Sequence, residues 1–356
     1  MPELFSVSVD SNKIMNYNSP EGRAYMKRAL QLSLMGAPNV SPNPMVGAVI
    51  VADGRIIGEG YHRQFGEAHA EVNAIKSVRE KDRHLLKKAT MYVTLEPCSH
   101  FGKTPPCADL LISERIPAVK IATEDPFLKN YESGIEKMRA AGIDVEIGML
   151  GDEARFINRR FFTAHTLKRP YVLLKWARSS DGFIAGPGNR PVSLSSAFTK
   201  VLMHRERSLY DAILVGPGTI VSDNPSLTVR YWPEREPSLR PLKVTFDSDL
   251  ISGESKLEAG SLIRKHRDEL LGNFLERLYR EYKITSLMVE GGRKTLESFL
   301  KEGLYDEIRV ETSSVRIGDG VPSPEILNLH PVPLSCEIYG GNMINTYLRN
   351  DFNLSL

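Results

Sequence analysis

The chain has 356 residues, of which 41% are apolar and 25% charged, an ordinary globular composition with enough apolar material for two cores. Its net charge of +2 gives no global field that would favour nucleic acid, and no run of 18 apolar residues predicts a membrane span. Only three cysteines occur, which excludes a disulfide scaffold and suits a reducing compartment, so we expect a cytoplasmic protein.

Residues 1–18 are polar and lack the basic start and apolar centre of a signal peptide, so we expect a loosely held tail. A helix then runs from a Ser19 cap to about Gly36. Two short apolar strands, 48–51 and 56–58, are separated by a glycine turn and predict a hairpin.

Asn43 lies between Pro42 and Pro44, in a stiff loop that leads into this hairpin. On such a loop its amide could hydrogen-bond a ribose or a ring edge of a ligand. It could equally be a turn-forming asparagine, and the spacing alone does not separate these two interpretations.

Residues 69–107 carry the candidates for a metal site. His69 and Glu71 begin a helical apolar pattern, and Cys98 and Cys107 enclose a loop rich in glycine and proline after a strand. One imidazole and two thiolates are three ligands for tetrahedral zinc, and the open fourth position would hold water whose pKa the ion lowers. Glu71 is the candidate for moving protons. Because residues two apart diverge on a regular helix, we expect His69 at the very first turn.

Each of these residues has a simpler interpretation when it is taken singly. A His-Ala-Glu sequence is usually a solvated helix turn, and free cysteines are usually small buried hydrophobes. Their order along the chain favours zinc instead. We expect His69 and Cys98 near helix N-termini, where the partial positive charge favours thiolate, and Cys336 as a free thiol.

Beyond the second cysteine, strands and helices alternate, which predicts α/β units with sheets covered on both faces. We expect helices at 108–114, 134–141, 195–209, 268–281 and 295–300, and strands at 118–122, 145–147, 171–175, 212–215, 242–246, 286–290 and 307–310. A connecting helix is expected at 151–169, ended by Pro170, with a domain boundary there.

Two glycine turns follow buried strands of the second half, at 216–219 (GPGT) and at 290–295 (EGGRKT). Such turns let a main chain approach a phosphate, so a dinucleotide or a phosphosugar could bind there. Most glycine turns are only turns, however, and neither matches the GxGxxG fingerprint of dinucleotide-binding folds.

The run TLEPCSHFGKTPPC from Thr94 to Cys107 resembles the riboflavin-pathway branch of the zinc deaminases, as does the PNPMVG loop around Asn43. The runs LKWARSSDG, AILVGPGT, DNPSLTVR and VEGG resemble the reductase domain of the bifunctional riboflavin-biosynthesis deaminase–reductases. The resemblance covers residues 20–310, with the two domains in the same order.

This resemblance implies an α/β protein with a cytidine-deaminase-like three-layer domain at 19–150, a connecting helix at 151–169 and a dihydrofolate-reductase-like domain at 170–356. It implies zinc-dependent hydrolytic deamination of 2,5-diamino-6-(5-phosphoribosylamino)pyrimidin-4(3H)-one, followed by NADPH-dependent reduction of the ribosyl group to ribityl. The cofactors would be one zinc ion per chain and NADPH. The partner would be a small phosphorylated pyrimidine rather than a nucleic acid or a membrane, and a homo-oligomer stays open.

The resemblance also assigns roles to individual residues. In the first half it implies zinc ligands (His69, Cys98 and Cys107), a proton shuttle (Glu71) and a substrate contact (Asn43). In the second half it implies substrate positions (Arg207, Leu227, Arg230 and Glu290), the arginines suiting a 5′-phosphate, and positions that line NADPH (Ala177, Thr219, Asp223, Gly291 and Gly292). Lys175 and Asp181 are either proton donors or a strand-end ion pair.

Three departures from the family pattern are present. The usual S-x-W-I-T segment is PVSLS at 191–195, the usual DPNP is DPFL at 125–128, and a strand-and-helix segment that commonly follows the position of Lys256 is missing. They leave open an active deaminase with a degenerate reductase domain. A non-catalytic zinc-stabilised nucleotide-binding module is the third interpretation.

Overall fold

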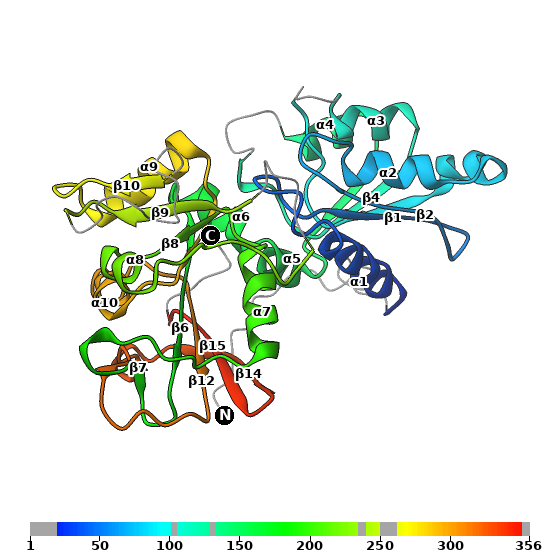
Figure 1. The fold of residues 1–356 in the computed structure, drawn as a ribbon. Coiled ribbons are helices and arrows are strands. Elements are labelled where there is room, and N and C mark those ends of the chain that lie inside the picture. Colours follow the sequence, from blue (N-terminus) through cyan, green and yellow to red (C-terminus); the bar gives the residue numbers. More distant parts are fainter. Residues whose placement is uncertain (1–19, 101–104, 128–132, 234–239, 250–261, 351–356) are drawn as a thin grey trace, which may run out of the picture. The chain divides into compact units, whose positions relative to one another are not determined.

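The computed structural model describes residues 20–100, 105–127, 133–233, 240–249 and 262–350 (Figure 1). The chain divides into two compact units, Met1–Asn158 and Arg159–Leu356. The expected N-terminal tail, the Ser19 cap and the stretch around Lys256 lie outside the described residues.

The first unit is built on a five-stranded sheet in the order β2-β1-β3-β4-β5. Its strands are β1 Gly47–Ala52, β2 Arg55–Tyr61, β3 Thr90–Val93, β4 Ala118–Ile121 and β5 Asp144–Ile147. Its helices are α1 Pro20–Leu34, α2 Ala70–Ser77, the 3-10 helix η2 Glu80–Lys88, α3 Cys107–Ser113, α4 Gly134–Ala140 and α5 Gly151–Ile157. Strand β1 pairs antiparallel with β2 and β3, and β3, β4 and β5 are parallel.

Helices cover both faces of this sheet, as the alternation in the sequence predicted. Along β1, Ala48 and Ile50 belong to the core beneath α2, α3 and α4, whereas Val49 and Val51 belong to the core with α1 and α5 (Figure 1). Successive strand residues point to opposite faces, so a fully apolar strand predicts burial on both sides.

Two glycines allow helices to lie directly on the hairpin. A Cβ on Gly47 would lie 2.0 Å from the carbonyl oxygen of Ala29 in α1. A Cβ on Gly60 would lie 2.2 Å from the amide nitrogen of Ala74 and 2.5 Å from the carbonyl oxygen of Ala70, both in α2. These positions therefore fix the height of α1 and α2 above the sheet.

The second unit has an eight-stranded sheet in the order β10-β9-β8-β11-β6-β12-β15-β14. Its strands are β6 Tyr171–Arg178, β8 Ala212–Leu214, β9 Leu242–Phe246, β10 Leu262–Lys265, β11 Ser286–Val289, β12 Glu307–Thr312, β14 Val332–Tyr339 and β15 Asn342–Leu348, and β7 Phe183–Ala185 pairs separately with β13 Val321–Pro322. Its helices are α6 Arg159–Leu167, the 3-10 helix η4 Pro187–Asn189, α7 Ala197–Arg207, α8 Pro217–Asp223, α9 Leu271–Tyr282, α10 Arg293–Glu302 and the 3-10 helix η7 Leu327–Leu329.

The two faces of the larger sheet differ in character. Val172 and Leu174 of β6 pack into an apolar core with Phe274 of α9 and Phe299 of α10. The opposite face carries Tyr171 of β6 and several charged side chains. Six strands run parallel, and the antiparallel hairpin β14–β15 extends the sheet at one end.

The structure contains elements that the sequence analysis did not predict, among them η2, α8 and β10, and it differs further at residues 151–169 and at the C-terminal hairpin. Residues 151–169 form two helices, α5 and α6, which belong to different units. Between them Asn158 leaves helical geometry, and its side chain both donates to and accepts from the main chain of Met45, at 2.9 and 2.8 Å. The hairpin β14–β15 was not predicted, although the Gly340-Gly341 turn is a hairpin signal. Strand β14 is largely exposed, and of the alternating buried residues of β15 (Asn342, Ile344 and Thr346) only one is apolar.

Candidate active sites

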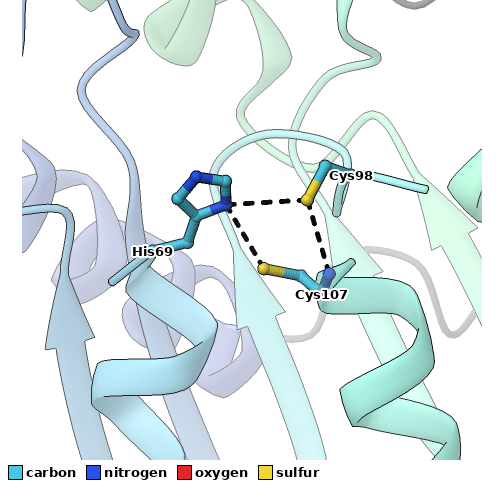
Figure 2. Close-up of side chains that lie close together, drawn as sticks. All are labelled: His69, Cys98 and Cys107. Carbon is cyan, nitrogen blue, oxygen red and sulfur yellow. Dashed lines mark hydrogen bonds between the residues drawn. The ribbon is translucent and has the colours of Figure 1, made fainter. Parts of the chain in front are cut away.

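His69, Cys98 and Cys107 converge in the first unit (Figure 2). The Nδ1 atom of His69 lies 3.6 Å from Sγ of Cys98 and 3.4 Å from Sγ of Cys107, and all three ligand atoms lie within 4.8 Å of one another. A tetrahedral zinc ion with Zn–S of about 2.3 Å and Zn–N of about 2.0 Å would place nitrogen and sulfur roughly 3.5 Å apart. The two distances from the imidazole to the sulfur atoms therefore fit a bound zinc ion.

His69 and Cys107 are positioned by the N-terminal ends of two helices, α2 and α3. His69 is the N-cap of α2, with extended backbone angles (φ −70°, ψ 168°), and Glu71 lies in the first helical turn. His69 thus lies one residue before the first turn in which it was expected, and because its backbone is extended the two side chains need not diverge. Cys107 begins α3, and its N–H donates to Sγ of Cys98 at 3.4 Å.

A carboxylate that the sequence did not single out braces the cysteine loop. Glu96, buried two residues before Cys98, accepts from Oγ of Ser133 at 2.7 Å and from the Ile135 amide at 3.4 Å, both at the start of α4. Its other oxygen accepts from the amide of Asp125 at 3.3 Å. A negative charge at a helix N-terminus is stabilised, so Glu96 ties the loop to α4.

The site is electrostatically unusual. Glu71 is only 3% exposed, and burial raises its pKa to about 7, against the opposing effect of His69. The hydrogen bond from the Cys107 thiol is the main reason that the pKa of Cys98 falls to about 4, and the same bond raises that of Cys107. A carboxyl group that titrates near neutrality is suited to both accepting and returning a proton.

Asn43 lies close to a buried histidine that the sequence analysis did not identify. Nδ1 of His62 contacts the carbonyl oxygen of Ala68 at 3.1 Å, so Nδ1 carries the proton. Nε2 is then an acceptor and takes the amide hydrogen of Asn43 Nδ2 at 3.1 Å. This leaves the side-chain oxygen of Asn43 as the acceptor that a ligand could use. A lone histidine after a strand gave no signal in the sequence.

In the second unit, the two glycine turns lie next to each other, at the carboxyl ends of the neighbouring parallel strands β8 and β11. Oγ1 of Thr219 accepts from the amide of Gly292 at 3.0 Å. A Cβ on Gly291 would lie 2.7 Å from Cβ of Thr295, so the turn has no room for a larger residue.

Two other candidate cofactor residues lie on neighbouring elements. Ala177 is near the same end of β6, the strand beside β11. Asp223 ends α8, and its Oδ1 accepts from Oγ of Ser222 at 2.7 Å. The structure thus joins Thr219, Gly291 and Gly292 by direct contact, whereas Asp223 stands apart at the exposed end of its helix.

The candidate substrate residues are linked by Arg207. Its guanidinium forms two hydrogen bonds to the carboxylate of Glu290, at 2.6 and 2.8 Å, and a third to the carbonyl oxygen of Thr228 at 3.1 Å. Burial raises the pKa of Glu290, but Arg207 outweighs this effect and the pKa is lowered. Arg207 is therefore held by Glu290 and in turn holds the loop that follows α8.

The loop that follows α8 also carries the other two candidate substrate residues, Leu227 and Arg230. Leu227 has a left-handed backbone (φ +50°) and its side chain is buried among Ile213, Val215 and Ile220, which leaves only its main chain for a ligand. Arg230 forms no ion pair with another described residue, and its guanidinium lies 5.8 Å from the ring centre of Tyr231.

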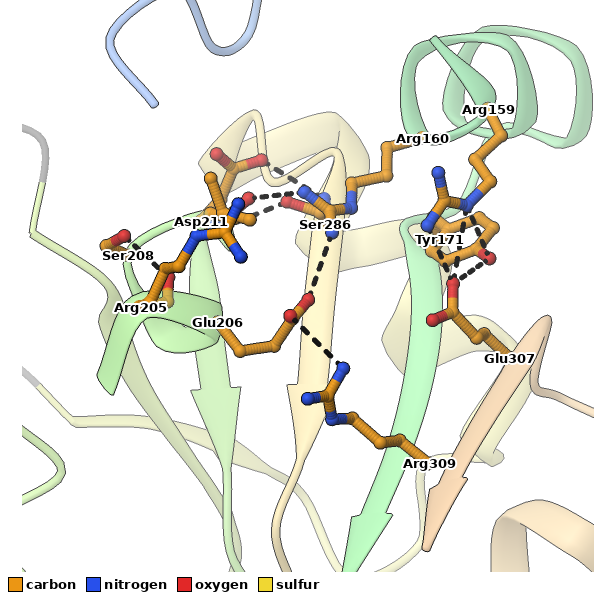
Figure 3. A network of polar contacts seen from close by, with 11 residues as sticks. Arg159, Arg160, Tyr171, Arg205, Glu206, Ser208, Asp211, Ser286, Glu307 and Arg309 are labelled. Carbon is orange, nitrogen blue, oxygen red and sulfur yellow. Dashed lines mark hydrogen bonds and ion pairs between the residues drawn. The ribbon is translucent and has the colours of Figure 1, made fainter. Parts of the chain in front are cut away.

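The face of the large sheet near these residues is strongly charged (Figure 3). Glu206 bridges Arg160 and Arg309, at 3.4 and 3.7 Å. A small cavity beside it is lined by Lys175, Thr199, Met203, Glu206, Met288, Arg309, Glu311 and Ile344. Burial lowers the pKa of Lys175, which favours release of its proton.

The other candidate proton donor has a different environment. Asp181 accepts from the main-chain amides of Ile317 and Gly318 and from the Ser179 hydroxyl, at 3.1, 2.8 and 2.6 Å. These bonds lower its pKa to about 2, the Ser179 bond most. Asp181 therefore holds a loop and does not pair with Lys175.

Comparison with known families gives two matches. Residues 20–123 match the cytidine and deoxycytidylate deaminase zinc-binding region, and residues 170–331 match the RibD C-terminal domain. These families imply Zn²⁺ and NADPH as cofactors, and His69, Cys98 and Cys107 form a cluster that could hold the metal ion.

Relatives match over most of the chain. The riboflavin biosynthesis protein RibD of Aquifex aeolicus is 40% identical over 83% of this chain and 88% of its own, and that of Escherichia coli is 34% identical over 83% and 88%. A solved diaminohydroxyphosphoribosylaminopyrimidine deaminase/5-amino-6-(5-phosphoribosylamino)uracil reductase from Thermotoga maritima is 35% identical, with a TM-score of 0.81 over 93% of this chain and 99% of that one.

These matches support the interpretation with two activities rather than the degenerate reductase or the non-catalytic module. They also agree with a small phosphorylated pyrimidine as the substrate. Among the described residues, no helix combines the length and the apolar character needed to cross a membrane. The zinc triad, the two α/β units and the relatives lead to one conclusion: the chain belongs to the RibD family of bifunctional riboflavin-biosynthesis enzymes, with a deaminase domain followed by a reductase domain.

Proposed function

We propose that this chain deaminates 2,5-diamino-6-(5-phosphoribosylamino)pyrimidin-4(3H)-one and then reduces the ribosyl group of the product to ribityl with NADPH. The name of the similar Thermotoga maritima enzyme supports these substrates. The single observation that carries the proposal is the convergence of His69, Cys98 and Cys107 beside the buried Glu71. We assign the first step to residues 19–150 and the second to residues 170–356, with 151–169 connecting them.

In the deaminase site, we assign His69, Cys98 and Cys107 as the zinc ligands. When bound, zinc supplies a Lewis acid that makes water nucleophilic near neutral pH. Glu71 takes the proton of the attacking water and returns it to the amino group that departs as ammonia. Its burial and its place in the first turn of α2 support this role.

Asn43 is assigned to substrate binding in the same unit. The hydrogen bond from its Nδ2 to His62 leaves its side-chain oxygen free to accept from an amino or hydroxyl group of the substrate. His62 thereby decides which end of the amide faces the ligand.

In the reductase site, we assign the Gly291-Gly292 turn, Thr219, Ala177 and Asp223 to NADPH. NADPH supplies the hydride that reaches C1′ of the sugar. The contact between Thr219 and Gly292 supports the first part of this assignment, because it shapes a glycine turn at the ends of parallel strands, where such sheets bind ligands.

Substrate binding in the reductase unit is assigned to Arg207, Leu227, Arg230 and Glu290. Arg230, which forms no ion pair with a described residue, is the side chain suited to the 5′-phosphate. The carboxylate of Glu290 is held by Arg207 and can still accept from a sugar hydroxyl, because each oxygen has two acceptor positions.

We further propose that the enzyme acts in the cytoplasm on this small molecule and not on nucleic acid or at a membrane, with a homo-oligomer left open. The low net charge and the absence of a disulfide among the three cysteines, all of which the structure describes, support the first part. The oligomeric state would be measured by sedimentation.

The proposal is tested by metal analysis together with ultraviolet absorbance after addition of the diaminopyrimidine phosphate. We expect about one zinc ion per chain, from three ligands in one cluster, and a spectral change that accompanies release of ammonia. Zinc without ammonia release from this compound would contradict the substrate, and protein without zinc but with full activity would contradict the mechanism.

A further inference from the structure

The loop from Asn224 to Arg230 lies between α8 and the following segment and belongs to no strand. It carries Leu227, in a left-handed conformation that costs a non-glycine residue free energy. Such a conformation persists only where surrounding groups hold it. Burial of the Leu227 side chain is one of these restraints, and the others come from the last turn of α7.

His204 provides the most direct of these contacts. Its side chain is buried, with 2% of the residue exposed, and its Nδ1 accepts from the main-chain amide of Arg230 at 3.0 Å. An amide can only donate, so Nδ1 is unprotonated and the ring is the neutral Nε2–H form. The main chain of Thr228 is a second hydrogen-bond partner of the ring.

The ring thus contacts the main chain of the loop at two residues, Thr228 and Arg230. Arg207, one turn along, reinforces the arrangement through its bond to the Thr228 carbonyl at 3.1 Å. The ring of Tyr231 closes the other side, edge-on to His204 with ring centres 4.8 Å apart.

We propose that His204 is a positioning residue of the reductase, which holds the main chain at 228–230 so that the Arg230 guanidinium meets the substrate phosphate. The proposal rests on the assignment of Arg230 to that phosphate. His204 itself need not touch the substrate, since its ring is occupied by the loop and by Tyr231.

The test compares His204→Phe, which keeps a ring but removes the acceptor, with His204→Asn, whose amide can accept from one main-chain group and donate to the other. Reduction of 5-amino-6-(5-phosphoribosylamino)uracil is followed at saturating NADPH. For His204→Phe we expect KM for the pyrimidine to rise about tenfold to a hundredfold, the usual effect of leaving a buried donor unpaired, with KM for NADPH unchanged. His204→Asn should restore most of the lost affinity. His266→Phe, an exposed histidine of the same unit, is the matched control and should behave as wild type.

A double-mutant cycle with Arg230→Gln decides whether His204 acts through Arg230. If it does, adding His204→Phe to Arg230→Gln should raise KM little further, because the two changes remove one interaction. The proposal would be overturned if His204→Phe raised KM in the Arg230→Gln variant as much as it does in the wild type. It would also be overturned if His204→Phe left KM unchanged, or if His204→Asn failed to restore affinity while deaminase activity stayed intact. An unchanged KM in Arg230→Gln alone would instead remove the phosphate assignment on which it rests.

Discussion

The deaminase chemistry depends on a carboxylate that follows a metal ligand by two residues. A helix normally separates such side chains by more than half a turn. Here the backbone of His69 is extended, and the helix begins one residue later. The imidazole and the Glu71 carboxylate can therefore serve one site while Glu71 remains buried.

Replacement of this carboxylate gives the first prediction. In Glu71→Gln we expect the rate of ammonia release to fall by about two to four orders of magnitude, since an amide cannot carry the proton. Zinc content should stay at the wild-type level, because Glu71 is not a ligand. A variant that keeps the wild-type rate would contradict the assigned role.

The second prediction concerns the metal ligands. In Cys107→Ser we expect loss of tightly bound zinc and of deamination, measured by metal analysis after dialysis against a chelator. NADPH oxidation with the deaminated pyrimidine should persist, because all assigned reductase residues lie in the other unit. Cys336→Ser, at an exposed thiol far along the chain, is the control and should retain zinc. Zinc retained in Cys107→Ser would refute the three-ligand site.

At the scale of elements, the placement of the site depends on how closely α2 lies on β2. Gly60 faces α2 with no space for a methyl group, since its Cβ would meet the main chain at 2.2 Å. Main-chain atoms cannot rotate away as a flexible side chain could, so any larger residue must displace the helix that bears Glu71.

We therefore predict that Gly60→Ala lowers the free energy of unfolding by about 1–3 kcal/mol, as overpacking does, and weakens zinc binding and deamination. Thermal unfolding and a zinc titration would measure this. Gly272→Ala is the matched control, because Gly272 lies in α9 with nothing within 4 Å of its Cβ position. Equal stability of the two variants would show that α2 can adjust.

In the second unit, a buried ion pair joins Arg169, two residues before β6, to Asp306, the residue before β12. The Arg169 guanidinium donates twice to the Asp306 carboxylate, both at 2.7 Å, and the carboxylate also accepts from the amide of Val172 at 2.8 Å. Asp306 is 1% exposed, so loss of its partner would leave a charge in the core.

Arg169→Met should accordingly destabilise the second unit by about 3–5 kcal/mol. Denaturant unfolding, followed together with NADPH oxidation, would reveal this, whereas zinc content should not change. Arg267→Met removes the cation of the exposed pair with Asp249 and is the control, with an expected loss of stability much smaller than that of Arg169→Met. Similar losses in both variants would contradict the importance of burial.

The sequence predicted the elements that local patterns encode and missed those that depend on distant partners. Apolar periodicity predicted α2, β6 and the three-layer first unit. It could not predict that Arg207 pairs with Glu290, which lies 83 residues away, or that Asn158 interrupts a helix by bonding to Met45. The His62 and His204 contacts were missed for the same reason, because each is made to a loop whose course is set by tertiary packing.

At the scale of the whole molecule, the two units have separate cores and separate candidate sites. The residues assigned to each step therefore lie within one unit. The product of the first unit is the substrate assigned to the second, so the two steps must follow a fixed order. A defect confined to one unit should stop one step without preventing the other.

The most direct measurement of this account is NADPH oxidation started with the diaminopyrimidine phosphate, in the wild type and in Glu71→Gln. We predict that the wild type consumes NADPH in an amount equimolar with the pyrimidine, and that Glu71→Gln consumes almost none unless the deaminated pyrimidine is supplied instead. Oxidation at the wild-type rate in Glu71→Gln with the diamino compound, or no oxidation by the wild type with either compound, would contradict the account.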